Sequence, residues 1–555
     1  MPRCVIVQSD RSILLEVDTP GYEEARDALA RFAELEKSPE HVHTYRVSPL
    51  SLWNAAAAGL TAPEILADLE KHSRFDIPQN VRAEIREQMA RFGRIRLEAE
   101  GDGYALRSAD PALIVQVWRH PKVRPHLREK TDESTILLDR GQRGPVKQAL
   151  LKIGWPVEDL AGYLDGDPLQ IDLKPDRVAG GTWGLRKYQQ EAADVFYAGG
   201  TAKGGSGVVV LPCGAGKTMV GLAAMARVKT STLILCTHVV AARQWRDEIL
   251  DKTTLSADQI GEYTGHVKEI RPVTMATYQI LTWRKKKTDP FVHFDIFNRA
   301  NWGLVIYDEV HLLPAPVFRV TADIQARRRL GLTATLVRED GREGDVFSLI
   351  GPKKYDVPWR VLEKQGWIAT AICREIRCDL DAEERMRYAS SGEREQFRIA
   401  SENPAKVAMV KALLEKHSQD RVLLIGQYLS QVEGLAAGLD APSITGKTPI
   451  RDRETYYDEF RRGTRRLLVL SKVGNFSLDL PDANVLIQVS GTFGSRQEEA
   501  QRLGRILRPK SDNAPAQFYS LVTRSTREED FAQKRQLFLT EQGYRYEVLD
   551  AGSFL

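Results

Sequence analysis

A glycine loop between an apolar strand and an apolar helix is the feature that most constrains this chain. Residues 208–211 are continuously apolar and predict a buried strand, while residues 219–226 predict a buried helix. The loop between them, residues 212–218, is Pro-Cys-Gly-Ala-Gly-Lys-Thr, and its small residues allow backbone N–H groups to surround phosphate oxygens. Lys217 can reach terminal phosphates, and the Thr218 hydroxyl can hold Mg²⁺. The sequence therefore predicts a nucleotide site here.

The loop alone does not prove that site. The general pattern has glycine where Leu211 stands, so the match is incomplete. A second Gly-Lys-Thr triplet, at residues 446–448, follows a short apolar segment and is followed by Pro449 and the charged residues 451–454. That context favours a loop that caps a polar helix over a second nucleotide site.

Bulk properties exclude several classes of protein. The chain has 555 residues, enough for several domains, and a net charge of only +4, so any nucleic-acid site must come from local clustering. The five cysteines include no Cys-x-x-Cys pair, which argues against zinc, iron–sulfur and disulfide frameworks. We see no signal peptide and no apolar span of membrane length, and we expect a cytoplasmic protein.

Changes of pattern along the chain predict four domains. Residues 1–95 combine short strands with amphipathic helices and predict a small α+β domain, and residues 96–175 follow the order strand, helix, strand, helix. Strands alternate with helices in residues 176–358, which is typical of a parallel α/β sheet, and again in residues 359–555. Residues 381–402 are polar and predict helices that project from the last domain.

Four shorter segments carry more local predictions. Residues 23–35 predict one amphipathic helix, and residues 165–175, which contain Gly, Asp and Pro, predict a linker. The basic residues of segments 120–128 and 284–287 favour solvated surface over nucleic-acid contact, although both readings stay open.

Two carboxylates that follow a buried strand are natural companions of the glycine loop. Asp308 can hold Mg²⁺, directly or through water, and Glu309 can orient and deprotonate an attacking water. Positive charge for the departing γ-phosphate can come from Arg505 and Arg508, which share one face of a predicted helix. Because Lys217 and these arginines fall in different predicted domains, ATP would lie between two α/β lobes, and its hydrolysis would move them.

The complete set of short motifs resembles that of superfamily 2 helicases and extends over residues 183–510. The motifs are Leu185–Gln189, Pro212–Thr218, Thr237, Thr277–Gln279, Asp308–His311, Thr333–Thr335, Ser471–Asp479 and Gln501–Arg508. The details are more similar still to the XPB helicase family. Residues 308–311 are Asp-Glu-Val-His, residues 338–340 resemble its Arg-Glu-Asp motif, and residues 381–402 lie where that family carries a thumb-like insertion. Residues 96–170 lie where it has a damage-recognition domain.

This resemblance implies an α/β fold with two RecA-like parallel-sheet lobes behind smaller α+β N-terminal domains. It implies an ATP-dependent 3′–5′ DNA helicase or double-stranded DNA translocase that acts in DNA repair and uses ATP and Mg²⁺. The residues implied to contact ATP are Arg186, Gln189, Gly214, Ala215, Gly216, Lys217, Thr218 and Gln501, with Gln189 at the adenine edge. Those implied to serve hydrolysis are Lys217, Asp308, Glu309, Arg505 and Arg508, and those implied to hold Mg²⁺ are Thr218 and Asp308. Those implied to contact DNA are Thr237, Thr277, Arg338, Glu339, Asp340, Thr445, Lys472 and Asn475.

The implied partner is DNA, as a duplex or a fork, with no membrane partner, and we expect a monomer. Archaeal members of the family pair with a nuclease, so a nuclease partner is also considered. Two alternatives stay open. One is an RNA helicase, because no single residue here distinguishes the sugar. The other is an ATP-clamped scaffold for DNA and a nuclease with weak unwinding, which the 175 N-terminal residues without catalytic motifs would suit.

Overall fold

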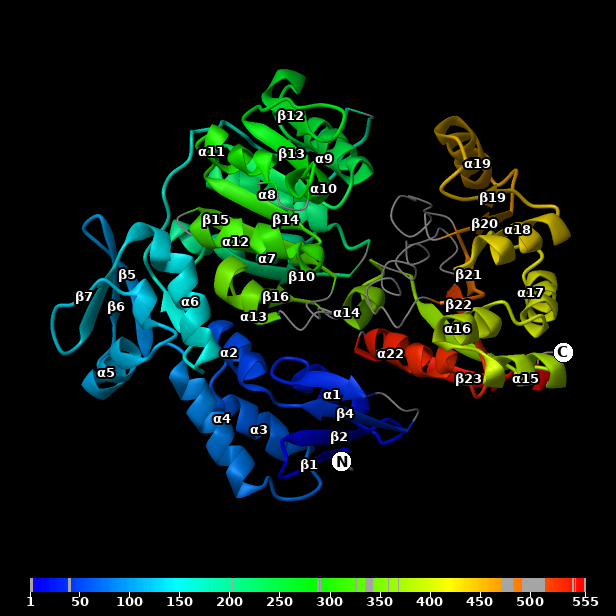
Figure 1. Cartoon of the computed structure of the whole chain (residues 1–555), viewed down its shortest axis with the longest axis horizontal. Helices are drawn as coiled ribbons and strands as arrows, with labels where there is room; N and C mark the ends of the chain where they lie inside the picture. The colour runs from blue at the N-terminus through cyan, green and yellow to red at the C-terminus, as the bar shows by residue number, and fades with distance from the viewer. Residues whose placement is uncertain are drawn as a thin grey trace.

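The glycine loop follows one strand of a sheet whose described strands are all parallel. The computed structural model describes the chain apart from residues 1–2, 38–40, 179, 202, 213, 287–288, 290, 325–326, 335–342, 358, 368, 472–482, 492–514, 542–543, 545 and 554–555. Among the described residues, this sheet has seven strands in the order β12-β13-β11-β14-β15-β10-β16, all paired in parallel. We call it, with its helices, lobe 1 (Figure 1).

The strands of lobe 1 are β10 (Ser206–Val210), β11 (Thr232–Cys236), β12 (Ile260–Tyr263), β13 (Val273–Thr277), β14 (Leu304–Asp308), β15 (Arg328–Thr333) and β16 (Lys353–Asp356). Its helices are α7 (Lys187–Tyr197), α8 (Lys217–Val228), α9 (Val239–Lys252), α10 (Tyr278–Leu281), α11 (Ile296–Arg299), α12 (Ala315–Asp323), α13 (Glu343–Asp345) and α14 (Trp359–Lys364).

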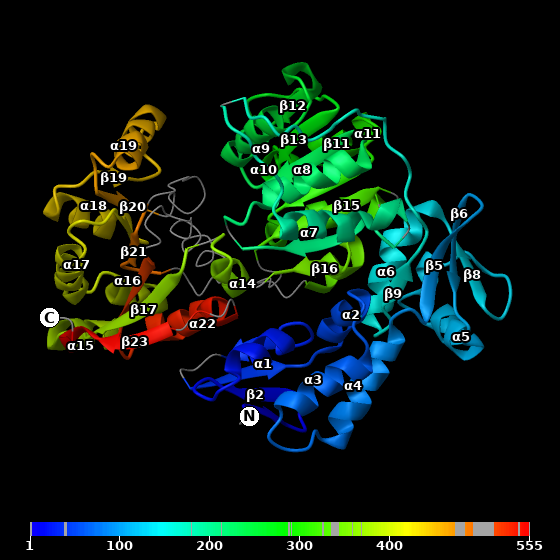
Figure 2. The ribbon, with the colours of Figure 1, turned by 180° about the vertical axis from the view of Figure 1, so that it is seen from behind.

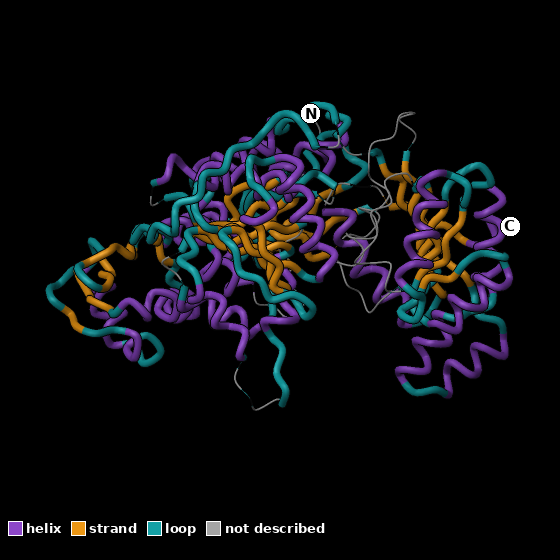
Figure 3. The backbone as a smooth tube through the Cα atoms, turned by 90° about the horizontal axis from the view of Figure 1, so that it is seen from above, coloured by secondary structure: helices purple, strands orange, loops and turns teal. Residues whose placement is uncertain are grey.

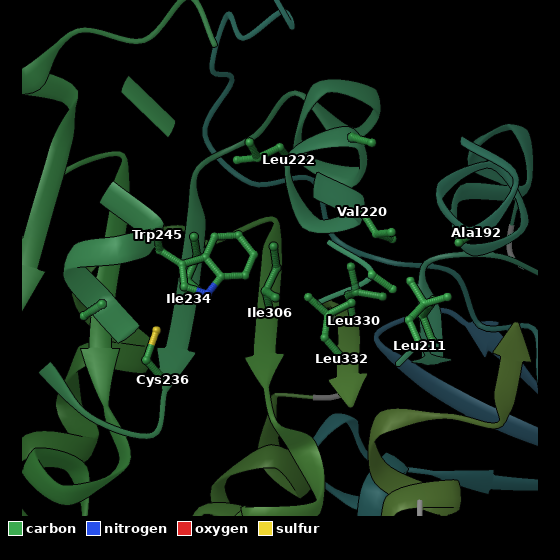
Figure 4. Close-up of a cluster of buried hydrophobic side chains, with 14 of the residues drawn as sticks. Ala192, Leu211, Val220, Leu222, Ile234, Cys236, Trp245, Ile306, Leu330 and Leu332 are labelled. Atoms are coloured by element: carbon green, nitrogen blue, oxygen red, sulfur yellow. The ribbon is translucent and has the colours of Figure 1, made fainter. Parts of the chain in front are cut away.

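The core of lobe 1 explains why its strands are continuously apolar. Every residue of β11 and β13 is buried, as expected for central strands of a parallel sheet covered on both faces. Leu222 of α8 and Trp245 of α9 pack over this sheet close to Ile234 (Figure 4). A Cβ atom on Gly221 would lie 2.3 Å from the Trp245 ring, so the glycine allows α8 and α9 to approach each other closely.

A second parallel sheet forms the body that we call lobe 2. In the part of the chain that is described, it has seven strands in the order β19-β20-β18-β21-β22-β17-β23. They are β17 (Ala371–Cys378), β18 (Val422–Ile425), β19 (Ser443–Ile444), β20 (Leu467–Leu470), β21 (Val485–Gln488), β22 (Ala516–Thr523) and β23 (Tyr546–Asp550). The two sheets stand apart in Figure 3, where strands are orange.

The helices of lobe 2 are α15 (Ala382–Ser390), α16 (Glu393–Ser401), α17 (Ala405–Lys416), α18 (Leu429–Gly438), α19 (Ile450–Arg462) and α22 (Arg527–Glu541). The predicted polar helices at 381–402 are α15 and α16. No residue of α15, all of which are described, is buried, whereas α16 buries Phe397 against Phe531 of α22. This insertion is therefore helical, and its second helix is packed on the lobe.

Two smaller units precede the lobes (Figure 2). The first has an antiparallel sheet, β1-β2-β4-β3, and four helices within the described residues. Its elements are β1 (Val5–Val7), β2 (Ser12–Glu16), α1 (Tyr22–Leu29), β3 (Glu34–Lys37), β4 (Val42–Arg46), α2 (Pro49–Ala57), α3 (Ala62–His72) and α4 (Gln79–Arg91). The prediction of one helix over 23–35 is wrong in its second half, because residues 34–37 pair with β4 instead. Tertiary pairing outweighs helix propensity there.

The second unit has a mixed sheet in the order β7-β8-β6-β5-β9, in which β5 and β9 are parallel. Its elements are β5 (Ile95–Glu100), β6 (Gly103–Arg107), α5 (Pro111–Arg119), β7 (Glu129–Lys130), β8 (Thr135–Leu138), α6 (Arg143–Lys152) and β9 (Val157–Asp159). In α6, Arg143 and Lys147 both pair with half-buried Asp159 of β9, within the same unit. Gln148 donates a 2.8 Å hydrogen bond to Asp345 of lobe 1, and this bond connects the second unit to lobe 1.

The segment that connects the second unit to lobe 1, residues 165–175, is the predicted linker and is packed against lobe 1. Pro168 and Leu173 form isolated bridges with Thr230 and Thr253, and Ile171 is buried in the core of lobe 1. The fold class, two RecA-like α/β lobes behind smaller units, is confirmed. No helix in the described ranges is long and apolar enough to cross a lipid bilayer.

Candidate nucleotide site

Two left-handed glycines shape the loop between β10 and α8. Gly214 has φ +80° and Gly216 has φ +79°, values that residues with side chains rarely adopt. A Cβ atom on Gly216 would lie 2.5 Å from Nε2 of Gln189, so a larger residue would also collide with α7. Buried Ala215 presents its carbonyl to α7, where it accepts hydrogen bonds from Tyr188 Oη at 2.7 Å and Gln189 Nε2 at 2.9 Å. Helix α7 therefore fixes the position of the loop through these two hydrogen bonds.

The side-chain amide of buried Gln189 makes hydrogen bonds through both its nitrogen and its oxygen. Its Nε2 donates to the loop carbonyl, and its Oε1 accepts a 2.9 Å hydrogen bond from the backbone N–H of Arg186. The residue expected at the adenine edge thus lies directly against the residues expected at the phosphates. Its contact with adenine stays a prediction.

An aromatic residue that the sequence did not point to lies beside Arg186. The Arg186 guanidinium is 4.3 Å from the ring centroid of Trp367, and its Nη1 donates a 3.1 Å hydrogen bond to Tyr188 Oη. Trp367 follows α14, in the stretch that connects the two lobes, and is partly exposed. It belongs to no motif, so only the folded structure places it at the edge of this site.

The loop lysine is paired with the second carboxylate. Lys217 Nζ lies 3.2 Å from Glu309 Oε1, and these side chains are 11% and 17% exposed. Glu309 has φ +52°, a left-handed conformation that costs a non-glycine residue about 1–3 kcal/mol and turns it away from the direction of β14. His311 Nδ1 is 3.4 Å from Glu309 Oε2 and 2.6 Å from Thr333 Oγ1. This network joins the ends of β14 and β15.

The first carboxylate residue, Asp308, accepts hydrogen bonds from Trp245, which belongs to none of the sequence motifs, and from Tyr278, which lies within the motif Thr277–Gln279 but had no predicted role. Trp245 Nε1 donates a 3.0 Å hydrogen bond to Asp308 Oδ2, and Tyr278 Oη donates one of 2.9 Å to the Asp308 carbonyl. Burial, helped by the neighbouring charge of Glu309, raises the pKa of Asp308 to about 6. Burial also opposes ionisation of Glu309, but the charges of Lys217 and His311 outweigh it and lower the Glu309 pKa. The pKa values of Asp308 and Glu309 are thus shifted in opposite directions, as they are in sites for acid–base catalysis.

The residues here fit a magnesium ion that is shared with a nucleotide. Thr218, in the first turn of α8, and Asp308, at the end of β14, offer the hard oxygen ligands that Mg²⁺ prefers. No cluster of three or more His, Cys, Asp or Glu side chains in the described ranges could hold a metal without further ligands. Phosphate oxygens and water would have to complete the coordination, which is the usual arrangement for Mg²⁺.

Two of the residues expected to contact DNA line one cavity. Thr237 follows β11 and Thr277 ends β13, and both border a cavity of about 910 Å³ at the carboxyl edge of lobe 1. The Thr277 hydroxyl also caps α10 by accepting a 3.4 Å hydrogen bond from the N–H of Ile280. Thr237 and Thr277 are therefore brought together on the side of the sheet where ligands of parallel α/β folds bind.

The second Gly-Lys-Thr triplet forms a turn before the polar helix α19. Thr445 Oγ1 accepts a 3.2 Å hydrogen bond from the N–H of Lys447, and Arg453 donates to the carbonyls of Thr445, Gly446 and Thr448. An arginine therefore occupies the inside of this turn. The prediction of a loop that leads into a polar helix is confirmed, although α19 begins after Pro449 and has no side-chain cap. The absence of a second nucleotide site stays a prediction.

The remaining expected site residues lie outside the described residues. They are Arg338, Glu339, Asp340, Lys472, Asn475, Gln501, Arg505 and Arg508. The half of the ATP site expected from lobe 2 therefore stays a prediction. The half in lobe 1, with Lys217, Asp308 and Glu309 at the carboxyl edge of a parallel sheet, defines the chain as an ATPase of the phosphate-loop class with two RecA-like lobes.

Comparison with known proteins specifies the family. Family models match three parts of the chain: ERCC3/RAD25/XPB C-terminal helicase at residues 362–553, type III restriction enzyme res subunit at 182–338, and helicase conserved C-terminal domain at 5–132. The DNA 3′-5′ helicase XPB of Kineococcus radiotolerans is 55% identical over 99% of this chain and 96% of its own length. That of Mycobacterium tuberculosis is 54% identical over 99% and 98%.

The similarity extends to eukaryotes. The XPB/SSL2 helicase/translocase subunit of general transcription and DNA repair factor IIH from Saccharomyces cerevisiae is 32% identical over 98% of this chain and 72% of its own length. The chain belongs to the XPB family of DNA 3′-5′ helicases.

Proposed function

We propose that the chain is an ATP-driven DNA 3′–5′ helicase or double-stranded DNA translocase of superfamily 2 that acts in DNA repair. The observation that carries this proposal is the 3.2 Å contact of Lys217 with Glu309, beside Asp308 at the carboxyl edge of lobe 1. A lysine on a glycine loop and two adjacent carboxylates of different acidity are the groups that phosphoryl transfer to water requires.

In the structure, Lys217 and Glu309 lie within ion-pair distance of each other. We propose that the terminal phosphates of ATP take over Lys217, which leaves Glu309 as the base that orients and deprotonates the attacking water. Thr218 and Asp308 would hold Mg²⁺, which neutralises charge on the phosphates when it is bound. The hydrogen bond from Trp245 keeps the Asp308 carboxylate in one orientation.

Lobe 2 would supply the rest of the machinery. In our proposal, Arg505 and Arg508 stabilise charge on the γ-phosphate and Gln501 contacts the nucleotide, so that hydrolysis changes the distance between the lobes. Because Arg186 contacts Trp367 in the connection between the lobes, a change at the adenine end would also reach this connection.

DNA would run along the carboxyl edges of the lobes. We propose that Thr237, Thr277, Thr445, Lys472 and Asn475 follow the backbone of one strand at a duplex or fork. Residues 338–340 would act where the strands separate. Phosphate contacts should make DNA binding weaken steeply as salt rises.

The remaining expectations extend this proposal. The domain boundaries would fall at residues 95, 175 and 358, with residues 96–175 in the position of a damage-recognition domain. We propose a cytoplasmic monomer, and we propose a nuclease as a partner.

The test compares ATP turnover with duplex DNA, single-stranded DNA and RNA of matched sequence, and strand separation on duplexes with a 3′ or a 5′ tail. DNA should stimulate turnover, and the 3′-tailed duplex should be opened. Stimulation by RNA alone would support an RNA helicase instead. DNA binding with stimulated turnover but no strand separation or translocation, even with a nuclease present, would support a scaffold.

A further inference from the structure

The cavity beside Thr237 and Thr277 has an apolar lining. Val239 and Val240 border it from the start of α9, Trp283 from the end of the α10 segment, and Pro314 from the segment after β14. Val240 is 49% exposed and Trp283 is 52% exposed, although both are large apolar side chains. With a volume of about 910 Å³, the cavity is large enough for a planar organic ring.

The apolar part of this lining, around Val239, Val240 and Trp283, is unsuited to a phosphate. A phosphate that entered an aliphatic and aromatic surface would lose water without gaining hydrogen bonds, which is costly for a charged group. The face of a nucleobase has the opposite requirement, because stacking on an aromatic ring is favourable and independent of sequence. The polar side chains of the lining, which are Thr237, His238, His266, Thr277, Gln279 and Thr282, are available to the backbone next to such a base.

Trp283 is exposed and lies beside another aromatic ring. Its ring centroid lies 6.0 Å from that of His293, at an interplanar angle of 56°, and His293 makes a 2.9 Å hydrogen bond with Tyr263. Trp283 is 52% exposed, so it offers an aromatic surface on which a base can stack.

Positive charge adjoins this aromatic surface. Arg284, Lys285 and Lys286 follow Trp283 directly and are all exposed, and the Arg284 guanidinium lies 4.4 Å from the ring centroid of Phe291. Aromatic and basic side chains in alternation are the usual surface for single-stranded nucleic acid, because they bind bases and phosphates respectively.

We propose that this cavity takes one unstacked nucleobase of the DNA strand that lobe 1 follows, with Trp283 as its stacking partner and residues 284–286 on the flanking phosphates. The proposal rests on the proposed function, since the strand must run along the carboxyl edge of lobe 1. It adds to backbone tracking a contact with a base, independent of which base it is.

The experiment measures the affinity of the full chain for a labelled oligothymidine and for an abasic strand of equal length, which keeps the phosphates and lacks the bases. One stacked base contributes about 1–3 kcal/mol, so the parent should prefer the oligothymidine by about 5- to 150-fold. Trp283→Ala should lose most of this preference and keep its affinity for the abasic strand, while Trp283→Phe should retain most of the preference. Phe75→Ala, which removes an exposed ring of the first unit, is the matched control and should behave as the parent.

A second variant protects the test against a folding defect. Val240→Asp places a charge at the edge of the cavity, in the first turn of α9, where an acidic residue is favourable for the helix. It should also lose the preference for bases, at an unchanged melting temperature.

Three results would overturn the inference. They are a parent without any preference for bases, a Trp283→Ala variant that keeps the preference of the parent, and an equal loss of affinity for both strands. Stimulation of ATP turnover by DNA in the parent tests the helicase proposal separately. A stimulated parent with no preference for bases would therefore remove this site and leave the proposed function intact.

Discussion

Each lobe contains a lysine–glutamate pair, and the two pairs differ in burial and in how completely their hydrogen-bonding groups are paired. In lobe 2, Lys406 and Glu528 are 0% exposed, and Lys406 Nζ lies 2.9 and 2.7 Å from the two carboxylate oxygens. Lys406 also donates to the Val489 carbonyl at 3.0 Å, and Glu528 accepts from the Thr523 N–H at 2.9 Å. In lobe 1, Lys217 and Glu309 approach only to 3.2 Å and stay partly exposed.

The environments of the two glutamates extend this difference. Glu309 has a left-handed backbone, and its Oε2 lies 3.4 Å from His311 Nδ1 but makes no hydrogen bond within the described part of the chain. The adjacent Asp308 has a raised pKa. A lysine–glutamate pair whose hydrogen-bonding groups are all paired stabilises the fold. A pair with an unsatisfied carboxylate oxygen and a strained backbone is suited to exchange one of its partners for a ligand. We therefore call Lys406–Glu528 the structural pair and Lys217–Glu309 the working pair.

The largest effect is expected for Lys217→Ala, which removes the working pair. ATP turnover should fall by at least about 100-fold, because a cation on the phosphates is lost. The melting temperature should stay close to that of the parent. Steady-state ATPase assays with duplex DNA measure the first quantity.

Lys447→Ala is the matched control, since this lysine stands in the same tripeptide but in the turn before α19. Its turnover should equal that of the parent. Normal turnover in Lys217→Ala would remove the lobe 1 site from consideration.

The structural pair should respond in stability. Lys406→Ala leaves Glu528 buried without its cation, and breaking a pair of this kind costs about 3–5 kcal/mol of unfolding free energy. Chemical denaturation measures this loss. A variant within about 0.5 kcal/mol of the parent, the range of ordinary surface substitutions, would show that the pair does not fix lobe 2.

Asp308→Asn is expected to stabilise the nucleotide-free protein while it abolishes turnover. The Asp308 pKa is about 6 when folded, against an ordinary value of 3.8, so the folded state binds a proton that the unfolded state has released. Stability contributed by Asp308 is thus present below about pH 4 and is lost as pH rises to about 6.

At pH 7 the asparagine variant should therefore be more stable by about 1–3 kcal/mol. Melting temperatures without nucleotide, measured at pH 4 and pH 7, test this difference. A variant that is less stable than the parent at pH 7 would contradict the account of Asp308 as a strained group.

The smallest effect is expected for Trp245→Phe. The hydrogen bond from Trp245 lowers the Asp308 pKa, and its loss should move the acidic limb of ATP turnover to higher pH. The pH profile of kcat/KM measures this limb, which should lie near pH 6 in the parent. An acidic limb that does not move in the variant would show that Asp308 does not set it.

The central part of the site could be predicted from the sequence because it depends on local pattern. Lys217 follows one buried strand and Asp308 ends another, and parallel strands place their carboxyl ends at one edge of a sheet. The same rule brings Thr237 and Thr277 to one cavity.

The supporting residues could not be predicted, because their contacts are distant in sequence. Trp245 and Asp308 are 63 positions apart, and Tyr188 and Ala215 are 27 apart. Trp245 belongs to none of the motifs, and Tyr188 lies within the motif Leu185–Gln189 but had no predicted role, because an aromatic side chain on an amphipathic helix is usually part of the core. Only the packing of the helices on the sheet assigns them to the site.

ATP binding and turnover by Glu309→Gln show whether Lys217 leaves Glu309 when a triphosphate binds. This variant should bind Mg²⁺–ATP more tightly than the parent, because Lys217 no longer has a charged partner, while turnover should fall by at least about 100-fold. Glu528→Gln, the same change in the structural pair, should lower stability and leave ATP affinity unchanged. Affinity in Glu309→Gln equal to or below that of the parent, or turnover close to that of the parent, would contradict the account.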